Sequence, residues 1–139
     1  MTTVAYRDGV MACDSQLTGG FKSVTPSKVV IGRSKMVGFC GDYASGYAGA
    51  QYLAEEASDK PESHSDDDNE YIVTDGKRIW LADTRLRLAP VGDKFWAVGS
   101  GGIAAMAAMY AGADAETAVK IAIKVDEYSG GKVRTFKLG

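Results

Sequence analysis

The sequence is poor in two residue types on which many enzyme sites are built: it has one histidine and two cysteines among 139 residues. His64 stands in a polar, acidic segment, and the histidine and cysteines do not have the spacing of metal ligands. A histidine-based catalytic triad and a zinc site are therefore not expected. Cys13 and Cys40 each lie in an apolar stretch, which indicates buried, reduced thiols. We expect no metal or organic cofactor, so any catalysis must use other groups.

Long apolar runs and a strong net charge are also missing. No run approaches the ~20 apolar residues that a membrane-spanning helix needs, and the N-terminus lacks the basic and apolar regions of a signal peptide. A formal net charge of −2 gives no general attraction to nucleic acid or anionic lipid. We therefore expect a cytoplasmic protein without a membrane or nucleic-acid partner, folded as a single domain over residues 1–139.

The apolar patterning predicts short strands with helices between them. Turns at Asp8-Gly9 and Asp75-Gly76 suit tight hairpins, and Asp114 is a plausible helix N-cap. Residues 85–91 alternate polar and apolar until Pro90 interrupts them, and residues 58–70 form an acidic surface loop. We expect strands at 2–6, 10–13, 28–32, 36–40, 71–73, 78–81, 95–98 and 133–138, and helices at 45–57, 103–111 and 115–127. Such segregated runs favour an α+β fold with antiparallel sheets packed against helices.

A threonine directly follows the initiator methionine. Removal of Met1 would give Thr2 a free α-amine beside its own hydroxyl. Because an α-amine titrates near about 7.7–8.0, it can act as the base for that hydroxyl. This arrangement activates a nucleophile without histidine, which suits the composition. Taken alone, a threonine at this position more often reflects processing than catalysis.

Six segments in order strengthen this interpretation: TTVAYRDGVMACDSQLT, SKVVIG, MVGFCGDYAS, FWAVGSGG, GADAETAVKIA and DEYSGG. Together they resemble proteasome β-type subunits and their bacterial HslV relatives, which are N-terminal-nucleophile (Ntn) hydrolases. The resemblance covers most of the chain. It implies the αββα sandwich of that family, in which two packed antiparallel β-sheets are flanked by helices, and a threonine-type endopeptidase.

The resemblance also implies roles for individual residues. Thr2 matches the nucleophile, and Asp14 matches the aspartate that orients the site lysine, which is Lys28. The lysine charge would lower the pKa of neighbouring groups and favour a developing oxyanion. The remaining matches are a serine near the terminal amine, an aspartate–serine pair around the threonine, and a glycine whose N–H serves as oxyanion donor; these are Ser100, Asp126 with Ser129, and Gly41.

Substrate contacts follow from the same resemblance. Thr18 matches a residue whose backbone pairs with an extended peptide, a mode in which main-chain hydrogen bonds hold the substrate. An apolar pocket next to the scissile bond would be bordered by Pro26, Val30, Phe39 and Tyr43. The expected substrate is a peptide or unfolded protein with an apolar residue before the cut.

The chain departs from the family between its first helix and Tyr71, where a second long helix is usual and only SDKPESHSDDDNE stands here. One helical layer is therefore expected to be reduced. Since helices of this kind help rings stack and meet ATPase partners, double-ring stacking and an ATP-driven unfoldase partner stay open. The missing helix should leave apolar sheet surface uncovered, which favours a homo-oligomer.

Each site residue also has a purely structural interpretation. Asp14 could cap a turn, Lys28 could be a solvated strand residue, Ser100 could be a helix N-cap, and Ser129 could belong to simple helix termination. A lysine among valines nevertheless needs a partner for its charge, and Asp14 is a natural one. Two other functions stay open: a non-peptidase Ntn amidohydrolase, and a non-catalytic scaffold or assembly protein.

Overall fold

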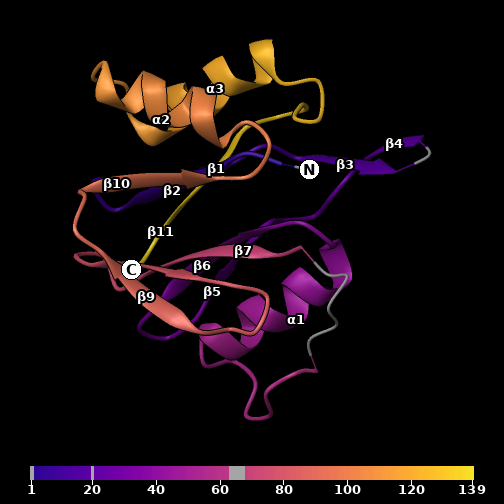
Figure 1. The fold of residues 1–139 in the computed structure, drawn as a ribbon, viewed down its shortest axis with the longest axis vertical. Coiled ribbons are helices and arrows are strands. Elements are labelled where there is room, and N and C mark those ends of the chain that lie inside the picture. Colours follow the sequence, from indigo (N-terminus) through magenta and orange to yellow (C-terminus); the bar gives the residue numbers. More distant parts are fainter. Residues whose placement is uncertain (1, 20, 63–67) are drawn as a thin grey trace.

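In the computed structural model, which describes residues 2–19, 21–62 and 68–139, two antiparallel sheets lie face to face between helices (Figure 1). The first sheet has the strand order β10-β1-β2-β11. Its strands are β1 (Val4–Arg7), β2 (Val10–Cys13), β10 (Phe95–Val98) and β11 (Arg134–Lys137). Its outer face is covered by helices α2 (Gly102–Tyr110) and α3 (Ala115–Val125). The first and last strands of the chain thus lie in one sheet, with β2 between them.

The second sheet has the order β5-β6-β7-β8-β9, with every neighbouring pair antiparallel. Its strands are β5 (Val29–Ile31), β6 (Met36–Cys40), β7 (Glu70–Thr74), β8 (Ile79–Ala82) and β9 (Leu88–Val91). Helix α1 (Tyr43–Leu53) packs on its outer face over β5, β6 and β7. The four layers, helices–sheet–sheet–helix, confirm the α+β sandwich that the sequence predicts.

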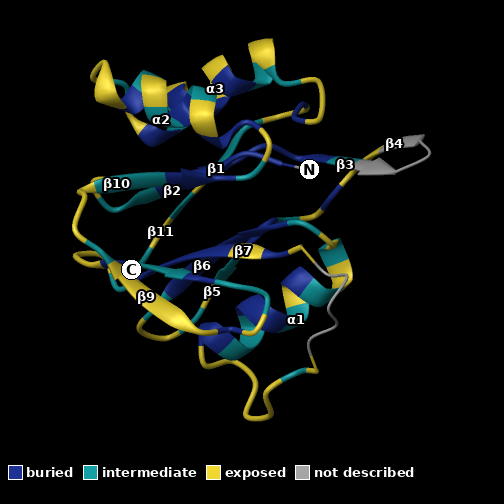
Figure 2. Cartoon of the chain, viewed as in Figure 1, coloured by how far each residue is buried: buried dark blue, intermediate teal, exposed yellow. Residues whose placement is uncertain are grey.

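Strand alternation divides the buried apolar residues, which lie in the dark blue parts of Figure 2, among three cores. Large side chains, among them Val4, Tyr6 and Met11, fill the space between the two sheets. The alternate residues Ala5 and Ala12 face α2 and α3, where small side chains let the helices approach the sheet closely. A third core joins α1 to the second sheet. Burial of all three cores fixes the register of the strands that carry the polar residues described below.

A two-stranded ribbon, β3 (Gln16–Gly19) with β4 (Phe21–Val24), extends beyond the sandwich and was not predicted (Figure 1). Strand β9 lies in the alternating run at residues 85–91, for which no strand was predicted, and the other strands and helices lie within a few residues of their expected positions. Helix α1 begins and ends earlier than residues 45–57, because Asp42 caps it by accepting a hydrogen bond from the Ser45 N–H. Asp114 caps α3 as expected. Pro90 lies within β9, which it can enter because β9 is the outermost strand of its sheet.

The turn of the first hairpin follows its sequence signal. Arg7 pairs with Val10 across a two-residue loop, in which Asp8 and Gly9 have φ angles of 51° and 81°. Two positive φ angles are the signature of a type I′ turn, whose twist matches that of the flanking strands. The hairpin therefore sets β1 and β2 in a fixed register and brings the segments at their open end together.

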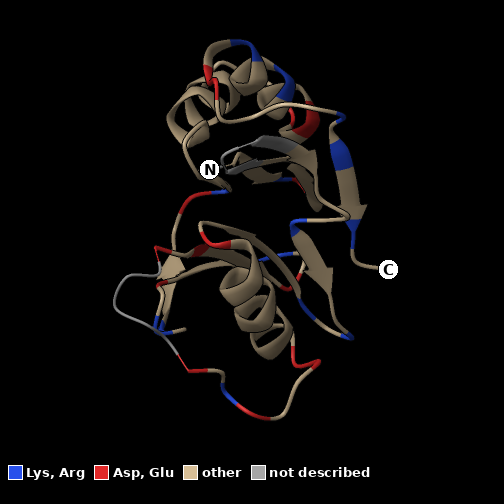
Figure 3. Ribbon diagram, turned by 90° about the vertical axis from the view of Figure 1, so that its right-hand side faces the viewer, with Lys and Arg blue, Asp and Glu red and all other residues tan. Residues whose placement is uncertain are grey.

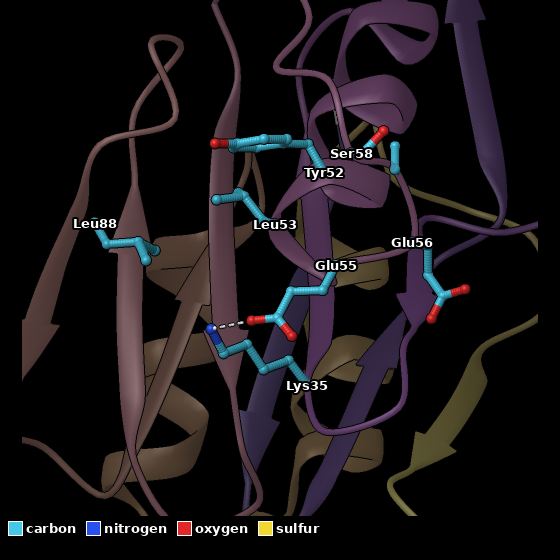
Figure 4. Close-up of a pocket in the computed structure, with 8 residues that line it drawn as sticks. Lys35, Tyr52, Leu53, Glu55, Glu56, Ser58 and Leu88 are labelled. Carbon is cyan, nitrogen blue, oxygen red and sulfur yellow. Dashed lines mark hydrogen bonds and ion pairs between the residues drawn. The ribbon is translucent and has the colours of Figure 1, made fainter.

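The described residues of the expected loop 58–70 lack helix, and Glu70 already belongs to β7. Acidic side chains gather on the segment that follows α1 (Figure 3). Beside it, a pocket of about 690 Å³ opens between the end of α1 and β9 (Figure 4). Lys35 and Glu55 form an ion pair of 3.1 Å on its rim, and Leu88 is 46% exposed. Part of the second sheet is thus left uncovered by α1, as the missing helix implied.

Candidate active site

Thr2 and Thr3 lead into β1 and are held against the segment that follows β10. The Gly101 N–H donates to the Thr2 carbonyl at 3.3 Å, and the Thr2 N–H donates to Ser100 Oγ at 3.2 Å. A Cβ atom at Gly99 would collide with the Thr2 carbonyl oxygen, and one at Gly101 would collide with Thr3 Oγ1. The glycines on both sides of Ser100 therefore permit the close approach that brings Ser100 to Thr2.

Asp126, directly after α3, accepts two hydroxyl hydrogen bonds on one oxygen. Ser100 Oγ and Ser129 Oγ each lie 2.6 Å from Asp126 Oδ2. Ser129 Oγ also lies 2.7 Å from the fully buried Thr3 Oγ1. Ser100, Asp126 and Ser129 thus form one network around the two threonines. The N-cap of α2 is Gly101, without a side-chain bond, so Ser100 is not the cap of that helix.

The direction of each hydrogen bond in this network follows from proton count. A serine hydroxyl has one proton, and the charged Asp126 carboxylate at 2.6 Å is its strongest acceptor. Ser100 Oγ is then an acceptor toward the Thr2 nitrogen, and Ser129 Oγ is an acceptor toward Thr3 Oγ1. Two short chains of donors therefore end on Asp126, one from each threonine.

The same contacts set the charge state of Asp126. Partial burial works to raise its pKa, but hydrogen bonds from Ser100, Ser129 and the Tyr128 N–H outweigh burial and hold the pKa below its usual value. The carboxylate therefore stays ionised at neutral pH and fixes the serine protons.

Asp14 and Lys28 form a second, fully enclosed part of the site. Lys28 Nζ lies 2.8 Å from Asp14 Oδ1 and 2.5 Å from the Gln16 carbonyl, and both side chains are buried. Three backbone N–H groups also donate to the Asp14 carboxylate, from Thr3, Gln16 and Gly130, at 3.0–3.3 Å. A buried charge pair needs such additional hydrogen bonds to offset desolvation. The expected Lys28–Asp14 pairing is thus present, and its link to the N-terminus runs through Thr3.

The turn before Lys28 is held by a residue from the other end of the chain. Arg134 Nη1, in β11, donates to the carbonyls of Thr25, at 2.5 Å, and of Pro26. The Lys28 carbonyl in turn accepts the Phe39 N–H at 3.0 Å. The lysine therefore enters the interior from a backbone fixed on both sides.

Gly41 lies at the end of β6 and has a φ of 95°. An added Cβ would collide with the Asp68 carbonyl oxygen, so both its conformation and its surroundings require glycine. Its sequence position, two residues after Phe39, puts it at the same end of the sheet as Lys28. Among the described residues, Gly41 makes no hydrogen bond to Thr2, so the structure places it near this end without joining it to the network.

The residues expected to contact a substrate differ in their burial and in the elements that carry them. Thr18 lies in β3, where its backbone is opposite Lys22. Pro26 is exposed, and Val30 is half-buried against the core beneath α1. Phe39 is only 1% exposed, with its ring 5.8 Å from that of Tyr43. The Tyr43 hydroxyl donates to the Ser27 carbonyl at 3.1 Å, so Tyr43 closes over the turn that carries Lys28.

Several residues of the site were not found from the sequence. Thr3 contributes its N–H to Asp14 and its hydroxyl to Ser129, and its only signal was its place beside Thr2. The Gly130 N–H and the Gln16 carbonyl act through the backbone, which carries no residue-specific signal. No group of His, Cys, Asp and Glu in the described part of the chain has the arrangement of a metal site. No helix of the described residues is long and apolar enough to cross a bilayer.

Comparison with known proteins locates this fold. No protein-family model and no curated protein matches the sequence. Two structures of Thiobacillus denitrificans BPH, one in complex with epoxomicin, match with TM-scores of 0.72 and 0.71 at 21% identity, over 99% of this chain and 98% of theirs. HslV from Trypanosoma brucei matches with a TM-score of 0.70 at 20% identity, over 98% of both chains. The chain therefore has the HslV/proteasome-like Ntn-hydrolase fold, which confirms the resemblance seen in the sequence.

Proposed function

We propose that this protein is a threonine peptidase in which Thr2, exposed by removal of Met1, is the nucleophile and its α-amine is the base. The observation that carries the proposal is the network around the first two threonines. In it, Ser100 Oγ lies 3.2 Å from the Thr2 nitrogen and donates its own hydrogen bond to the Asp126 carboxylate. The solved complex of a protein of the same fold with epoxomicin adds support.

The direction of that hydrogen bond suits an amine that must act as a base. After removal of Met1, Ser100 Oγ would accept one N–H of the amine because its proton is held by Asp126. The lone pair of the neutral amine is then left for the Thr2 hydroxyl, directly or through a water. Asp14 accepts the Thr3 N–H and holds the Lys28 ammonium in a buried ion pair, and the positive end of that pair would favour an ionised oxygen atom beside it.

In the proposed reaction, these groups form an ester on Thr2 and then hydrolyse it. The amine takes the Thr2 Oγ proton as Oγ attacks the peptide carbonyl carbon, and the Gly41 N–H stabilises the oxyanion that forms. The protonated amine gives its proton to the leaving nitrogen as the C–N bond breaks, which leaves an ester on Thr2. Water, deprotonated by the amine, then hydrolyses the ester and regenerates Thr2.

Intact-mass analysis before and after exposure to epoxomicin tests the proposal, because a peptide epoxyketone needs both the hydroxyl and the free amine of an N-terminal threonine. We expect loss of Met1 and one adduct per chain, mapped to Thr2. The variant Thr2→Ala should lose Met1 but take no adduct. A processed wild-type protein without an adduct would contradict the proposal, and a retained Met1 would favour the scaffold interpretation.

The substrate class needs its own test, because other Ntn hydrolases cleave small amides. β3 is a strand of a two-stranded ribbon whose backbone could pair with an extended peptide, which favours a peptide substrate. Peptides with free and blocked ends, compared with small acyl amides, separate the two. Cleavage of the acyl amides alone would identify an amidohydrolase instead.

We also propose that the protein acts as a homo-oligomer. Large apolar side chains are exposed on the described surface, among them Leu88 at 46%, Ile103 at 87% and Val125 at 71%. Leu88 borders the part of the second sheet that α1 leaves uncovered, and uncovered apolar sheet surface is typical of interfaces. Native mass spectrometry at micromolar concentration should give a multiple of the chain mass, and a purely monomeric species would contradict this part of the proposal.

A further inference from the structure

Asn69 is a buried polar residue that no part of the proposed mechanism uses. It lies just before β7, is 3% exposed, and is held from its own backbone, because its N–H donates to Thr84 Oγ1 at 3.1 Å. Its side-chain amide also has a partner on each side. Oδ1 lies 3.0 Å from Ser45 Oγ, which is also 2.7 Å from Asp42 Oδ2, and Nδ2 faces two carbonyl oxygens. These contacts fix which way the amide points.

The two carbonyls that Asn69 binds stand on either side of Gly41. Nδ2 lies 3.0 Å from the Cys40 carbonyl oxygen and 2.9 Å from the Asp42 carbonyl oxygen. Both protons of one amide group are therefore used to hold the chain before and after a single glycine. A buried side chain that donates hydrogen bonds to the backbone carbonyls before and after one residue defines the path of the backbone there.

The contact between Asn69 and the Cys40 carbonyl also determines the direction of the Gly41 N–H. The Cys40 carbonyl and the Gly41 N–H belong to the same peptide unit, and the described chain has no cis peptide. In a planar trans peptide the C=O and N–H bonds point in opposite directions. Because Asn69 holds the carbonyl, the Gly41 N–H must point away from Asn69, toward the other side of the strand end. Among the described residues, no acceptor of this N–H is found.

Gly41 needs such an anchor because its backbone is unusual. With a φ of 95°, it is free to rotate in ways that other residues are not, and its immediate neighbour is the Asp68 carbonyl oxygen. A freely rotating peptide would aim its N–H in many directions. Preorganised donors stabilise an oxyanion more than mobile ones because they need no reorganisation during the reaction.

We propose that Asn69 is a positioning residue that aims the Gly41 N–H at the developing oxyanion. It does not touch the substrate and acts only by holding the Cys40–Gly41 and Asp42–Tyr43 peptides. This inference rests on the proposed function, in which Gly41 is the oxyanion donor. It adds a residue from the acidic segment after α1 to a site otherwise built from the N-terminal segment, the turn before β5, the end of β6 and the segments that follow β10 and α3.

If Asn69 only stabilised the fold, loss of any of its hydrogen bonds would have a similar effect on catalysis. The test therefore compares loss of the bonds made by its side-chain amide with loss of the bonds made by its backbone. Asn69→Asp keeps the shape but cannot donate to the two carbonyls, and Asn69→Ala removes the amide. Thr84→Val is the matched control, because it removes the two hydrogen bonds between Thr84 Oγ1 and the Asn69 backbone and leaves the Asn69 amide group in place. Ser45→Ala, a milder change, removes the hydroxyl that lies between Asn69 Oδ1 and Asp42 Oδ2. Thermal unfolding of each variant establishes that it is folded.

The readouts are kcat and KM for peptide cleavage, and the affinity of a peptide aldehyde against that of the corresponding peptide alcohol. The aldehyde forms a tetrahedral adduct with an oxyanion, whereas the alcohol binds without one. We expect Asn69→Asp and Asn69→Ala to lower kcat by at least about tenfold with KM within about twofold, since an oxyanion donor acts only in the transition state. Aldehyde affinity should fall by a similar factor, and alcohol affinity should not.

Each outcome supports or overturns the inference. A smaller loss of the same kind in Ser45→Ala, with Thr84→Val close to wild type, supports it, and decides the question if both Asn69 variants fail to fold. Wild-type kcat in the folded Asn69 variants overturns it. An equal loss in Thr84→Val, or equal losses of aldehyde and alcohol affinity, also overturns it in favour of a structural role. Failure of the proposed function is distinct, because the wild-type protein would then not react with epoxomicin at all.

Discussion

Thr3 and Ser129, 126 positions apart in the chain, share a buried hydrogen bond of 2.7 Å between their hydroxyl oxygens. Since the Ser129 hydroxyl donates its one hydrogen bond to Asp126, the Thr3 hydroxyl is the donor in the bond to Ser129 Oγ. Two consecutive threonines are thus tied to one carboxylate, Thr2 through Ser100 and Thr3 through Ser129. The contacts of Thr3 therefore help to fix the position of Thr2.

The variants Thr3→Val and Thr3→Ser separate the hydroxyl of Thr3 from its shape. Thr3→Val removes the donor to the buried Ser129 oxygen, so we expect a loss of about 1–3 kcal/mol in the free energy of unfolding and slower epoxomicin labelling of Thr2. Thr3→Ser keeps the hydroxyl and should label at close to the wild-type rate. Urea unfolding and mass spectrometry measure the two effects, and equal behaviour of both variants would refute the assignment.

Lys28→Met removes the cation that faces the buried Asp14. Because an uncompensated buried charge remains, we expect a loss of about 3–5 kcal/mol in the free energy of unfolding, together with loss of peptide cleavage. The double variant Lys28→Met/Asp14→Asn should regain part of the stability and none of the activity. Denaturant unfolding and turnover assays of the single and double variants give the comparison. Wild-type turnover in Lys28→Met would count against a catalytic role for the lysine.

Asp126 should make stability depend on acid pH. Its pKa is held below the ordinary value of 3.8, so its contribution to stability is complete above pH 3.8 and is lost as pH falls through the folded-state pKa. The difference in unfolding free energy between wild type and Asp126→Asn should therefore be constant from pH 7 to about 5 and shrink below pH 3.8. A pH-independent difference would contradict the prediction.

The two cysteines should be inert in the folded protein. Burial raises the pKa of Cys13 to about 11 and that of Cys40 to about 12. At pH 8 the reactive thiolate would then be at most about one part in a thousand, in addition to being shielded. Iodoacetamide should modify neither thiol in native buffer and both in guanidinium chloride, as measured by intact mass. Rapid modification of the native protein would show that one of the thiols is accessible.

The sequence predicted the layers of the fold because the strands of the sandwich alternate clearly between core and helix-facing residues. It missed the β3–β4 ribbon because residues 16–24 mix polar, glycine and apolar residues without a clear period. The N-terminus of α1 was misplaced because Asp42 was not identified as its cap. The uncovered surface beside β9 was anticipated from a missing helix, and not from any pattern in β9 itself.

The candidate site was anticipated mainly through family resemblance. Pairing of Lys28 with Asp14 was the one contact that electrostatics alone suggested, since a lysine among valines needs a counter-charge. The part played by Asn69 could not be predicted, because an asparagine at the end of an acidic run looks like any other loop residue. Its place in the site depends on the folded path of β6 and β7.

The terminal strand β11 has a consequence for biosynthesis. Asp126, Ser129 and Gly130, which bind the N-terminal threonines and Asp14, are followed by the strand that pairs with β2, and Arg134 in that strand holds the turn before Lys28. Thr3 is therefore synthesised 126 positions before Ser129, and its hydrogen bond to Ser129 can form only after the segment that follows α3 has been made.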